Sequence, residues 1–93
     1  MVIKFSKKFR KQYQKLPKKI QQQTRGRIEL WQEDPTNSLL RVHRLEGKLA
    51  GYYSLNITND IRALYEIIGN DIYLYAMIGS HSQLYSWSSD LVF

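Results

Sequence analysis

Cysteine is absent from the sequence, proline and histidine occur only twice each, and no apolar stretch approaches the roughly 18 residues of a membrane-spanning helix. Without thiols, the chain can form neither disulfide bonds nor thiolate metal sites. The N-terminus lacks the pattern of a signal peptide, so we expect a cytoplasmic protein with no membrane association. The length of 93 residues and a hydrophobic content of 43% predict a single globular domain over residues 1–93.

Negative charge is missing from residues 1–28, although the whole chain contains eight Asp and Glu residues. The cations of this segment are Lys4, Lys7, Lys8, Arg10, Lys11, Lys15, Lys18, Lys19, Arg25 and Arg27. Such a polarised charge attracts polyanions, and nucleic-acid phosphates are its most common partners. A solvated, solubilising helix face is the alternative interpretation. A helix on a membrane surface is less favoured, because the core needs the few apolar residues of this segment.

The first third of the chain predicts a strand followed by a helical hairpin. Residues 2–5 (VIKF) alternate weakly, and Ser6 suits the N-cap of the next helix. Pro17 ends that helix and suits the start of a second one. Gly26 inside the second helix costs about 1 kcal/mol relative to alanine, unless it lets the helices approach closely. Side chains at helical spacing predict the core-facing stripes: Phe9, Tyr13 and Leu16, then Ile20, Thr24, either Arg27 or Ile28, and Trp31.

The remaining chain predicts strands. The segments GYYSLNI, IRALYEII and DIYLYAMIG, separated by TND and GND, predict three successive antiparallel strands after a shorter extended segment in LLRVHRLEG. The order β-α-α-β-β-β predicts an α+β domain, with the N-terminal helical hairpin packed on one face of a mainly antiparallel sheet. We expect the other face to be at least partly open to a ligand. Trp87 and Phe93, in the C-terminal tail, are expected to pack on the sheet edge or on a partner.

Five polar residues of the sheet half form a candidate site. His43 precedes the central strands, Asp60 and Arg62 border a hairpin, and His81 and Tyr85 follow the last strand. The start of one antiparallel strand and the end of its neighbour meet at the same sheet edge, so these residues can converge. Histidine serves as acid or base near neutrality, and the arginine fork suits two phosphoryl oxygens. This set fits metal-free cleavage of RNA, in which the ribose 2′-OH is the nucleophile.

Each candidate also has a structural interpretation. His81 lies between serines and suits a turn, and Asp60 in TND suits a turn aspartate. Arg62 can pair with Glu66 or Asp60, although an exposed pair contributes only about 0–1 kcal/mol. Two histidines and a carboxylate can ligate iron or zinc, but His43, Asp60 and His81 lack tight ligand spacing. We therefore expect neither a metal nor a cofactor.

The stretch LEGKLAGYYSLNITNDIRALYEIIGNDIYLYAMIGSHSQLY combines several spaced motifs. They are Leu-x-Gly (Leu45, Gly47), Gly-Tyr (Gly51, Tyr52), Asp-x-Arg-x-x-Tyr (Asp60, Arg62, Tyr65) and a terminal Gly-Ser-His that leads to an aromatic residue (Gly79, Ser80, His81, Tyr85). These motifs, the chain length and the basic hairpin resemble the RelE/ParE superfamily of toxins from bacterial type II toxin-antitoxin systems. The segments IGSHSQLY and VHRLEG look most like its YafQ-type branch.

The resemblance implies an mRNA interferase, a toxin that cuts translated mRNA in the ribosomal A site and is neutralised by a cognate antitoxin. His81 matches a histidine that is the candidate general acid of histidine-bearing branches. His43 and Asp60 match residues of the YafQ-like site, with His43 the first candidate for the base and Asp60 the second. Arg62 matches the phosphate-binding arginine, and Tyr85 matches the aromatic residue that stacks on mRNA.

We further expect a set of cations to bind RNA or the ribosome: Lys7, Lys8, Arg10, Lys11, Lys15, Lys18, Lys19, Arg41, Arg44 and Lys48. Two positions depart from the YafQ-like pattern, since Asn56 replaces a further histidine and Ile61 replaces a tryptophan. A ParE-like poison of DNA gyrase is the first alternative function, although that branch generally lacks the arrangement of His81 and Tyr85. A relic that binds RNA or antitoxin without catalysis is the second.

Overall fold

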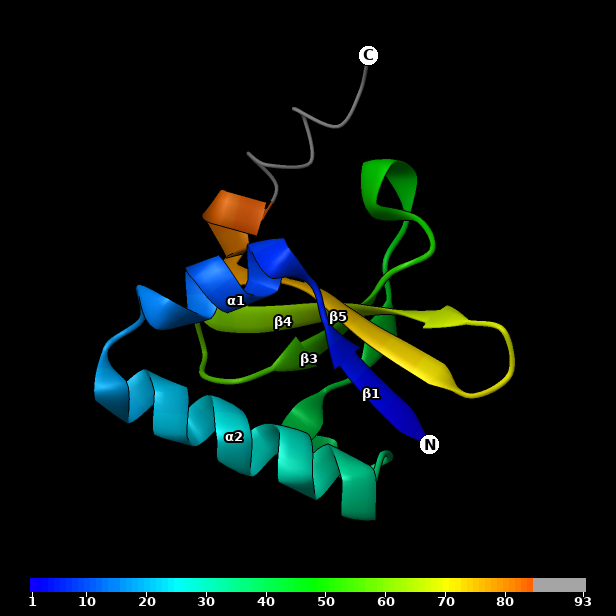
Figure 1. Ribbon diagram of the computed structural model, residues 1–93, viewed down its shortest axis with the longest axis horizontal. Helices are drawn as coiled ribbons and strands as arrows, with labels where there is room; N and C mark the ends of the chain where they lie inside the picture. The colour runs from blue at the N-terminus through cyan, green and yellow to red at the C-terminus, as the bar shows by residue number, and fades with distance from the viewer. Residues whose placement is uncertain (85–93) are drawn as a thin grey trace.

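The computed structural model, which describes residues 1–84, contains one five-stranded sheet in the order β1-β5-β4-β3-β2 (Figure 1). Strand β1 runs parallel to β5, and the other neighbours are antiparallel. This arrangement confirms the expected α+β fold. The sequence signals for Tyr85, Trp87 and Phe93 lie outside the described residues. The elements are β1 (Val2–Phe5), α1 (Lys7–Gln14), α2 (Lys18–Glu33), the 3-10 turn η1 (Ser38–Leu40), β2 (His43–Arg44), the 3-10 turn η2 (Gly47–Leu49), β3 (Tyr53–Asn56), β4 (Ile61–Ile68) and β5 (Ile72–Ser80).

The two helices form the expected hairpin, and side chains hold its ends. The hydroxyl of Ser6 accepts a hydrogen bond from the backbone N–H of Phe9 at 2.9 Å, which caps α1 as the sequence predicts. The side-chain amide of Gln21 donates to the carbonyl oxygens of Tyr13 and Leu16, at 3.0 and 3.1 Å. These bonds join the first turn of α2 to the end of α1, and they fix the turn between the helices.

The main core lies between the helices and the sheet, where Trp31 of α2 packs among three tyrosines. Its ring centroid lies 5.1 Å from those of Tyr65 and Tyr73 and 5.6 Å from that of Tyr75. Such aromatic pairs contribute about 0.5–1.5 kcal/mol each beyond the area they bury. In Figure 1, α2 runs below the sheet. Neither this helix nor α1 is long and apolar enough to cross a membrane, and the same holds throughout residues 1–84.

Helix α1 covers an edge of β5 that β1 leaves unpaired. Strand β1 pairs with residues 72–75 only. Farther along β5, the carbonyl oxygen of Ala76 accepts from the hydroxyl of Ser6 at 2.7 Å, and the N–H of Ile78 donates to the side chain of Gln12 at 2.9 Å. Unpaired strand edges expose backbone donors and acceptors. Helix α1 and its N-cap therefore hold β5 in place close to its end, and His81 follows directly after that end.

The second face of the sheet is covered more fully than the sequence suggests. Leu49, Leu64, Met77 and Leu84 form a separate buried cluster on it. Leu49 comes from η2, and Leu84 comes from a helical turn at residues 81–84. Figure 1 places both segments above the sheet, on the side opposite α2. A ligand can therefore reach this face only where the cover leaves a cavity.

Candidate active site

A cavity of about 200 Å³ opens on the covered face, between β2 and the helical turn at 81–84. It is smaller than the roughly 300–1,000 Å³ of pockets that enclose a drug-sized molecule, so it suits a phosphodiester rather than a whole base. Its apolar wall belongs to the second cluster, and its polar wall contains both histidines of the chain. The lining residues are Leu45, Leu49, Leu64 and Leu84 on the apolar side, and His43, Ser54, Arg62 and His81 on the polar side.

His43 enters the cavity from the short strand β2, opposite Ser54 in the register. Its Nδ1 atom lies 2.9 Å from the carbonyl oxygen of Arg41. A carbonyl oxygen only accepts, so Nδ1 carries the hydrogen of this bond and, in the neutral ring, Nε2 has the free lone pair. Arg41 adopts a left-handed backbone conformation with φ of 46°. The local backbone thus orients His43 with the nitrogen of a general base available.

His81 begins the helical turn that follows β5, and a reciprocal pair of bonds fixes it there. The N–H of Gln83 donates to the hydroxyl of Ser80 at 3.2 Å, while the side chain of Gln83 accepts from the N–H of Ser80 at 3.0 Å. This is the capping box of a Ser-x-x-Gln sequence. His81 therefore lies in a turn, as one interpretation of the sequence expects, and also lines the cavity, because the turn directs the residue toward it.

Arg62 of β4 is held by amides rather than by carboxylates. Its Nη1 donates to the side-chain oxygen of Asn56, and its Nη2 donates to the carbonyl oxygen of Asn59 at 3.3 Å. The Nε atom is buried and has no partner among the described residues. Glu66, considered above as an ion-pair partner, lies beside Tyr52. The pKa of Tyr52 is raised, chiefly by burial and to a smaller extent by the negative charge of Glu66 and a hydrogen bond to it. The guanidinium charge thus remains available to a ligand.

Asp60 lies next to the cavity without lining it among residues 1–84. Its carbonyl oxygen accepts from the backbone N–H of His81 at 3.2 Å, which joins the β3–β4 turn to the end of β5. The hydroxyl of Thr58 accepts from the N–H groups of Asp60 and Ile61, at 3.2 and 2.9 Å. The turn therefore uses the threonine hydroxyl, and the side chain of Asp60 is exposed. In the described chain, no three His, Asp or Glu residues gather as metal ligands would.

The structure brings together three of the five site residues selected from the sequence: His43, Arg62 and His81. Asp60 contributes its backbone at the margin. Tyr85 lies outside the described residues, so its predicted stacking role stays a prediction. The geometry favours His43 over Asp60 as the base, because only His43 both lines the cavity and has its ring oriented by an acceptor.

Ser54 is the residue that sequence reasoning missed. It is only 1% exposed, it lines the cavity, and its hydroxyl has no hydrogen-bond partner among the described residues. Leaving a buried hydroxyl unpaired costs about 1–3 kcal/mol, so such a group requires an explanation. The signal lies in GYYSLNI, where Ser54 and Asn56 alternate with apolar residues and so share a sheet face, and where Asn56 pairs with Arg62.

The cations expected to bind RNA or the ribosome are all exposed, but they occupy two regions. One group lies on the helical hairpin, and the other surrounds β2 and η2 beside the cavity. The first contains Lys7, Lys8, Arg10, Lys11, Lys15, Lys18 and Lys19, and the second contains Arg41, Arg44 and Lys48. The guanidinium carbon of Arg44 lies 6.0 Å from the centroid of the Tyr53 ring, within cation–π range.

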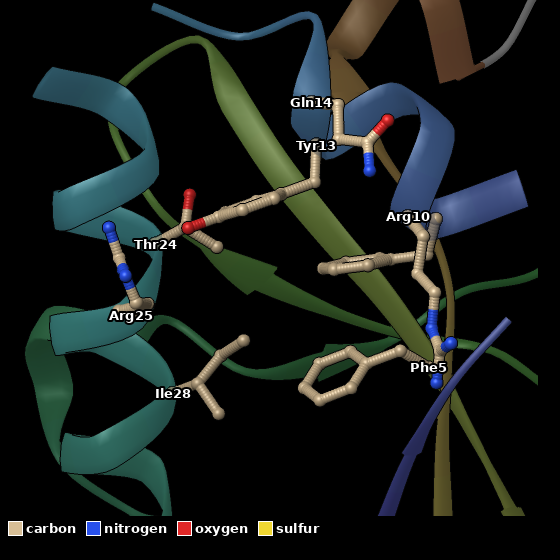
Figure 2. Close-up of a pocket in the computed structure, with 8 residues that line it drawn as sticks. Phe5, Arg10, Tyr13, Gln14, Thr24, Arg25 and Ile28 are labelled. Atoms are coloured by element: carbon tan, nitrogen blue, oxygen red, sulfur yellow. The ribbon is translucent and has the colours of Figure 1, made fainter. Parts of the chain in front are cut away.

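A separate groove of about 390 Å³ lies between α1 and α2 (Figure 2). Phe5, Phe9 and Ile28 give it apolar walls, and Arg10 and Arg25 come from the two helices on either side. In the described chain, its lining contains none of the acid–base residues of the candidate site. Its composition fits contact with another molecule rather than catalysis.

Comparisons with known proteins agree with this fold. The family described as "Bacterial toxin of type II toxin-antitoxin system, YafQ" matches residues 1–86. YafQ from E. coli superimposes with a TM-score of 0.76 at 17% identity, over 89% of this chain and 96% of that chain. A YoeB/ParE toxin from Agrobacterium tumefaciens gives 0.72 at 21% identity, over 87% and 99% of the two chains. A RelB-RelE antitoxin-toxin complex from Methanococcus jannaschii gives 0.70 at 20% identity, over 90% and 96%. Curated proteins gave no match. The chain belongs to the YafQ family of toxins from bacterial type II toxin-antitoxin systems.

Proposed function

We propose that the protein is a ribosome-dependent endoribonuclease that cuts mRNA during translation in the cytoplasm. One observation carries this proposal: both histidines of the chain line a single cavity together with Arg62. Cleavage through the ribose 2′-OH requires a base, an acid and a cation that stabilises the phosphoryl oxygens, and two imidazoles and a guanidinium can supply all three.

In the proposed reaction, Nε2 of His43 accepts the proton of the ribose 2′-OH, and the 2′-oxygen attacks the adjacent phosphorus. His81, in its protonated form, donates a proton to the 5′-oxygen of the next nucleotide as that oxygen leaves. The products are a 2′,3′-cyclic phosphate and a free 5′-hydroxyl, so no water is consumed. The bond from Nδ1 of His43 to the carbonyl oxygen of Arg41 supports this role, because it stabilises the imidazolium that forms.

Two polar groups on the cavity wall are assigned to the phosphate. Arg62 lies at a fixed orientation, because Asn56 and Asn59 hold its two terminal nitrogens. The hydroxyl of Ser54 has no hydrogen-bond partner in the described part of the chain and can donate to a phosphoryl oxygen. Preorganised donors of this kind act without reorganisation as negative charge develops on the phosphorane, which makes them effective in catalysis.

We assign the exposed cations of the hairpin and of the β2 region to contacts with ribosomal RNA and mRNA. Phosphate contacts make affinity strongly dependent on salt. The catalytic cavity is small, so affinity for the ribosome must come from a wider surface. The exposed cations provide such a surface on the hairpin and around β2.

We also propose a cognate antitoxin as partner, supported by the similarity to a toxin crystallised with its antitoxin. The groove between α1 and α2 combines aromatic walls with Arg10 and Arg25, so it suits an acidic amphipathic segment (Figure 2). Such a segment places apolar side chains into the groove and carboxylates against the two arginines.

The decisive experiment is primer extension on an mRNA being translated in a purified system, with and without the protein. We expect new 5′ ends inside the reading frame that disappear when translation is blocked, and no cuts with His81→Ala. A supercoiling assay on DNA gyrase belongs beside it, because gyrase inhibition without mRNA cuts would favour the ParE-like function instead. Absence of both activities, with RNA or antitoxin binding retained, would favour the non-catalytic relic.

A further inference from the structure

A cationic cleft of about 770 Å³ lies between α2, residues 38–41 and the β3–β4 turn. Lys19, Arg27 and Arg41 supply its charge, and among the described residues that line it there is no carboxylate. Its volume falls within the roughly 300–1,000 Å³ of pockets that enclose whole small ligands, in contrast to the smaller catalytic cavity. The cleft can therefore accommodate a nucleotide, whereas the cavity suits only the phosphodiester.

The walls of the cationic cleft combine three kinds of chemistry. The cations suit phosphates, and the side-chain amides of Gln23 and Asn59 can both donate to and accept from a base edge. Leu39 offers an apolar surface, since its side chain is 61% exposed within the cleft. Single-stranded RNA is recognised by this combination of charge, base-edge hydrogen bonds and contact with base faces.

Two hydrogen bonds connect the walls of the cleft to the walls of the catalytic cavity. Arg41 lines the cleft, and its carbonyl oxygen binds Nδ1 of His43 at 2.9 Å. Asn56 also lines the cleft, and its side-chain oxygen accepts from Nη1 of Arg62. His43 and Arg62 both line the cavity. The cleft therefore borders the residues of the catalytic cavity, which places it beside the scissile phosphate of the proposed reaction.

We propose that the cationic cleft binds the mRNA nucleotide next to the scissile phosphate and thereby selects the sequence that is cut. This inference rests on the proposed endoribonuclease function and assigns that function a specificity site. Gln23 and Asn59 read the base, Lys19 and Arg27 bind its phosphates, and Leu39 contacts its face. Asn56 has a double role, because it borders the cleft and positions Arg62.

Affinity measurements test the cationic part of the proposal. The ligand is a ribosome programmed with mRNA whose scissile ribose is 2′-deoxy, so that no cleavage occurs. We expect Lys19→Gln and Arg27→Gln each to weaken binding several-fold and to reduce the slope of log affinity against log salt by about 0.7 per lost phosphate contact. Lys4→Gln is the matched control, because Lys4 is an exposed cation on β1, at the opposite sheet edge from β2. Equal weakening by all three variants would overturn the proposal, since net charge alone would then explain the effect.

Mapping of cut sites tests the reading of the base. We expect Gln23→Ala and Asn59→Ala to reduce the preference for the favoured base beside the cut by roughly fivefold or more, as loss of a base-edge contact does. Photocrosslinks from 4-thiouridine placed beside the 2′-deoxy position should fall on residues 19–27, 38–41 or 56–59. Crosslinks confined to other segments, or an unchanged cut pattern, would overturn the inference. Loss of antitoxin affinity alone in these variants would assign the cleft to the antitoxin.

The two proposals fail in different ways. If the wild-type protein cuts translated mRNA but the cleft variants bind and cut normally, the specificity site is wrong and the nuclease function stands. If crosslinks map to the cleft but no cuts form, the cleft binds RNA and the proposed catalysis is wrong. Thermal unfolding of each variant separates these outcomes from misfolding. Lys19→Gln is less prone to misfold than Arg27→Gln. The side chain of Lys19 is exposed, whereas Arg27 donates a hydrogen bond to the carbonyl oxygen of Leu39 at 3.4 Å.

Discussion

His43 presents its Nδ1 atom to the carbonyl oxygen of Arg41, 2.9 Å away, and this bond assigns the hydrogen to Nδ1. The left-handed backbone of Arg41, with φ of 46°, contributes to the geometry. Few non-glycine residues adopt that conformation, and it persists where the surrounding structure enforces it. This orientation leaves Nε2 of His43 to accept a proton, so we expect His43 to act as the base and His81 as the acid of the same reaction.

Replacing either histidine should abolish most of the activity, and a substrate with a better leaving group should separate the two roles. We expect His43→Ala and His81→Ala each to lower the cleavage rate by about 10²- to 10⁴-fold, as removal of an acid or base does. Sulfur in place of the leaving 5′-oxygen should restore much of the rate to His81→Ala, because a thiolate leaves without a donated proton. It should restore little to His43→Ala. Single-turnover cleavage on programmed ribosomes measures both, and equal rescue of the two variants would contradict the assignment.

Ser54→Ala separates a functional hydroxyl from a structural one. Because the hydroxyl is buried and has no partner within residues 1–84, its removal should leave the free energy of unfolding unchanged or raise it by about 1 kcal/mol. Cleavage should nevertheless slow, by up to about 10²-fold, if the hydroxyl donates to the phosphate. Tyr75→Phe is the matched control, since it also removes a buried hydroxyl that has no partner among the described residues, but from the helix-side core. Equal cleavage rates in both variants would remove Ser54 from the site.

Asn56 is expected to act through Arg62. Asn56→Ala removes the acceptor of Nη1, so the guanidinium should lose its fixed orientation while its charge remains. We expect a drop in the cleavage rate of about tenfold, as misplacement of a positioning group produces, with little change in ribosome affinity. Asn56→Asp keeps an acceptor but places a carboxylate against the guanidinium, so it should also slow cleavage, because the charge is then neutralised rather than misplaced. If both variants cleave at the wild-type rate, Arg62 needs no support from Asn56.

The elements that sequence predicted well are those set by local patterns. Ser6 caps α1, and Trp31 lies on the buried stripe of α2, because helix signals depend on near neighbours. The second apolar cluster was not predicted, since Leu49 and Leu84 meet only after the chain folds back on the sheet. Asn56, noted as a departure from the family pattern, turns out to bind Arg62. Such a partnership depends on strand register, which the sequence does not specify.

Gly26→Ala should stabilise the protein. The sequence left open whether this glycine allows a close approach of the helices, and the structure excludes that reason: a Cβ at this position would meet no atom within 4 Å from any other described segment. Alanine has the higher helix propensity and loses less backbone freedom on folding, so we expect a gain of about 0.5–1 kcal/mol in the free energy of unfolding. Urea denaturation measures the difference. A loss of stability would mean that Gly26 has a role that helix propensity does not describe.

Tyr75→Phe should make the protein more resistant to alkali. Burial, with a smaller contribution from Tyr65, raises the pKa of Tyr75 well above its usual range. In the unfolded chain a tyrosine ionises near pH 10, whereas folded Tyr75 stays neutral there. Its contribution to stability is thus complete below about pH 10 and is lost as the pH rises further, at about 1.4 kcal/mol per pH unit.

Phenylalanine cannot ionise, so the Tyr75→Phe variant should lose this part of the pH dependence of stability. Burial also raises the pKa values of Tyr52 and Tyr65, so a smaller slope remains. Urea denaturation of both proteins at increasing alkaline pH gives the two slopes, and parallel slopes would show that Tyr75 ionises without unfolding.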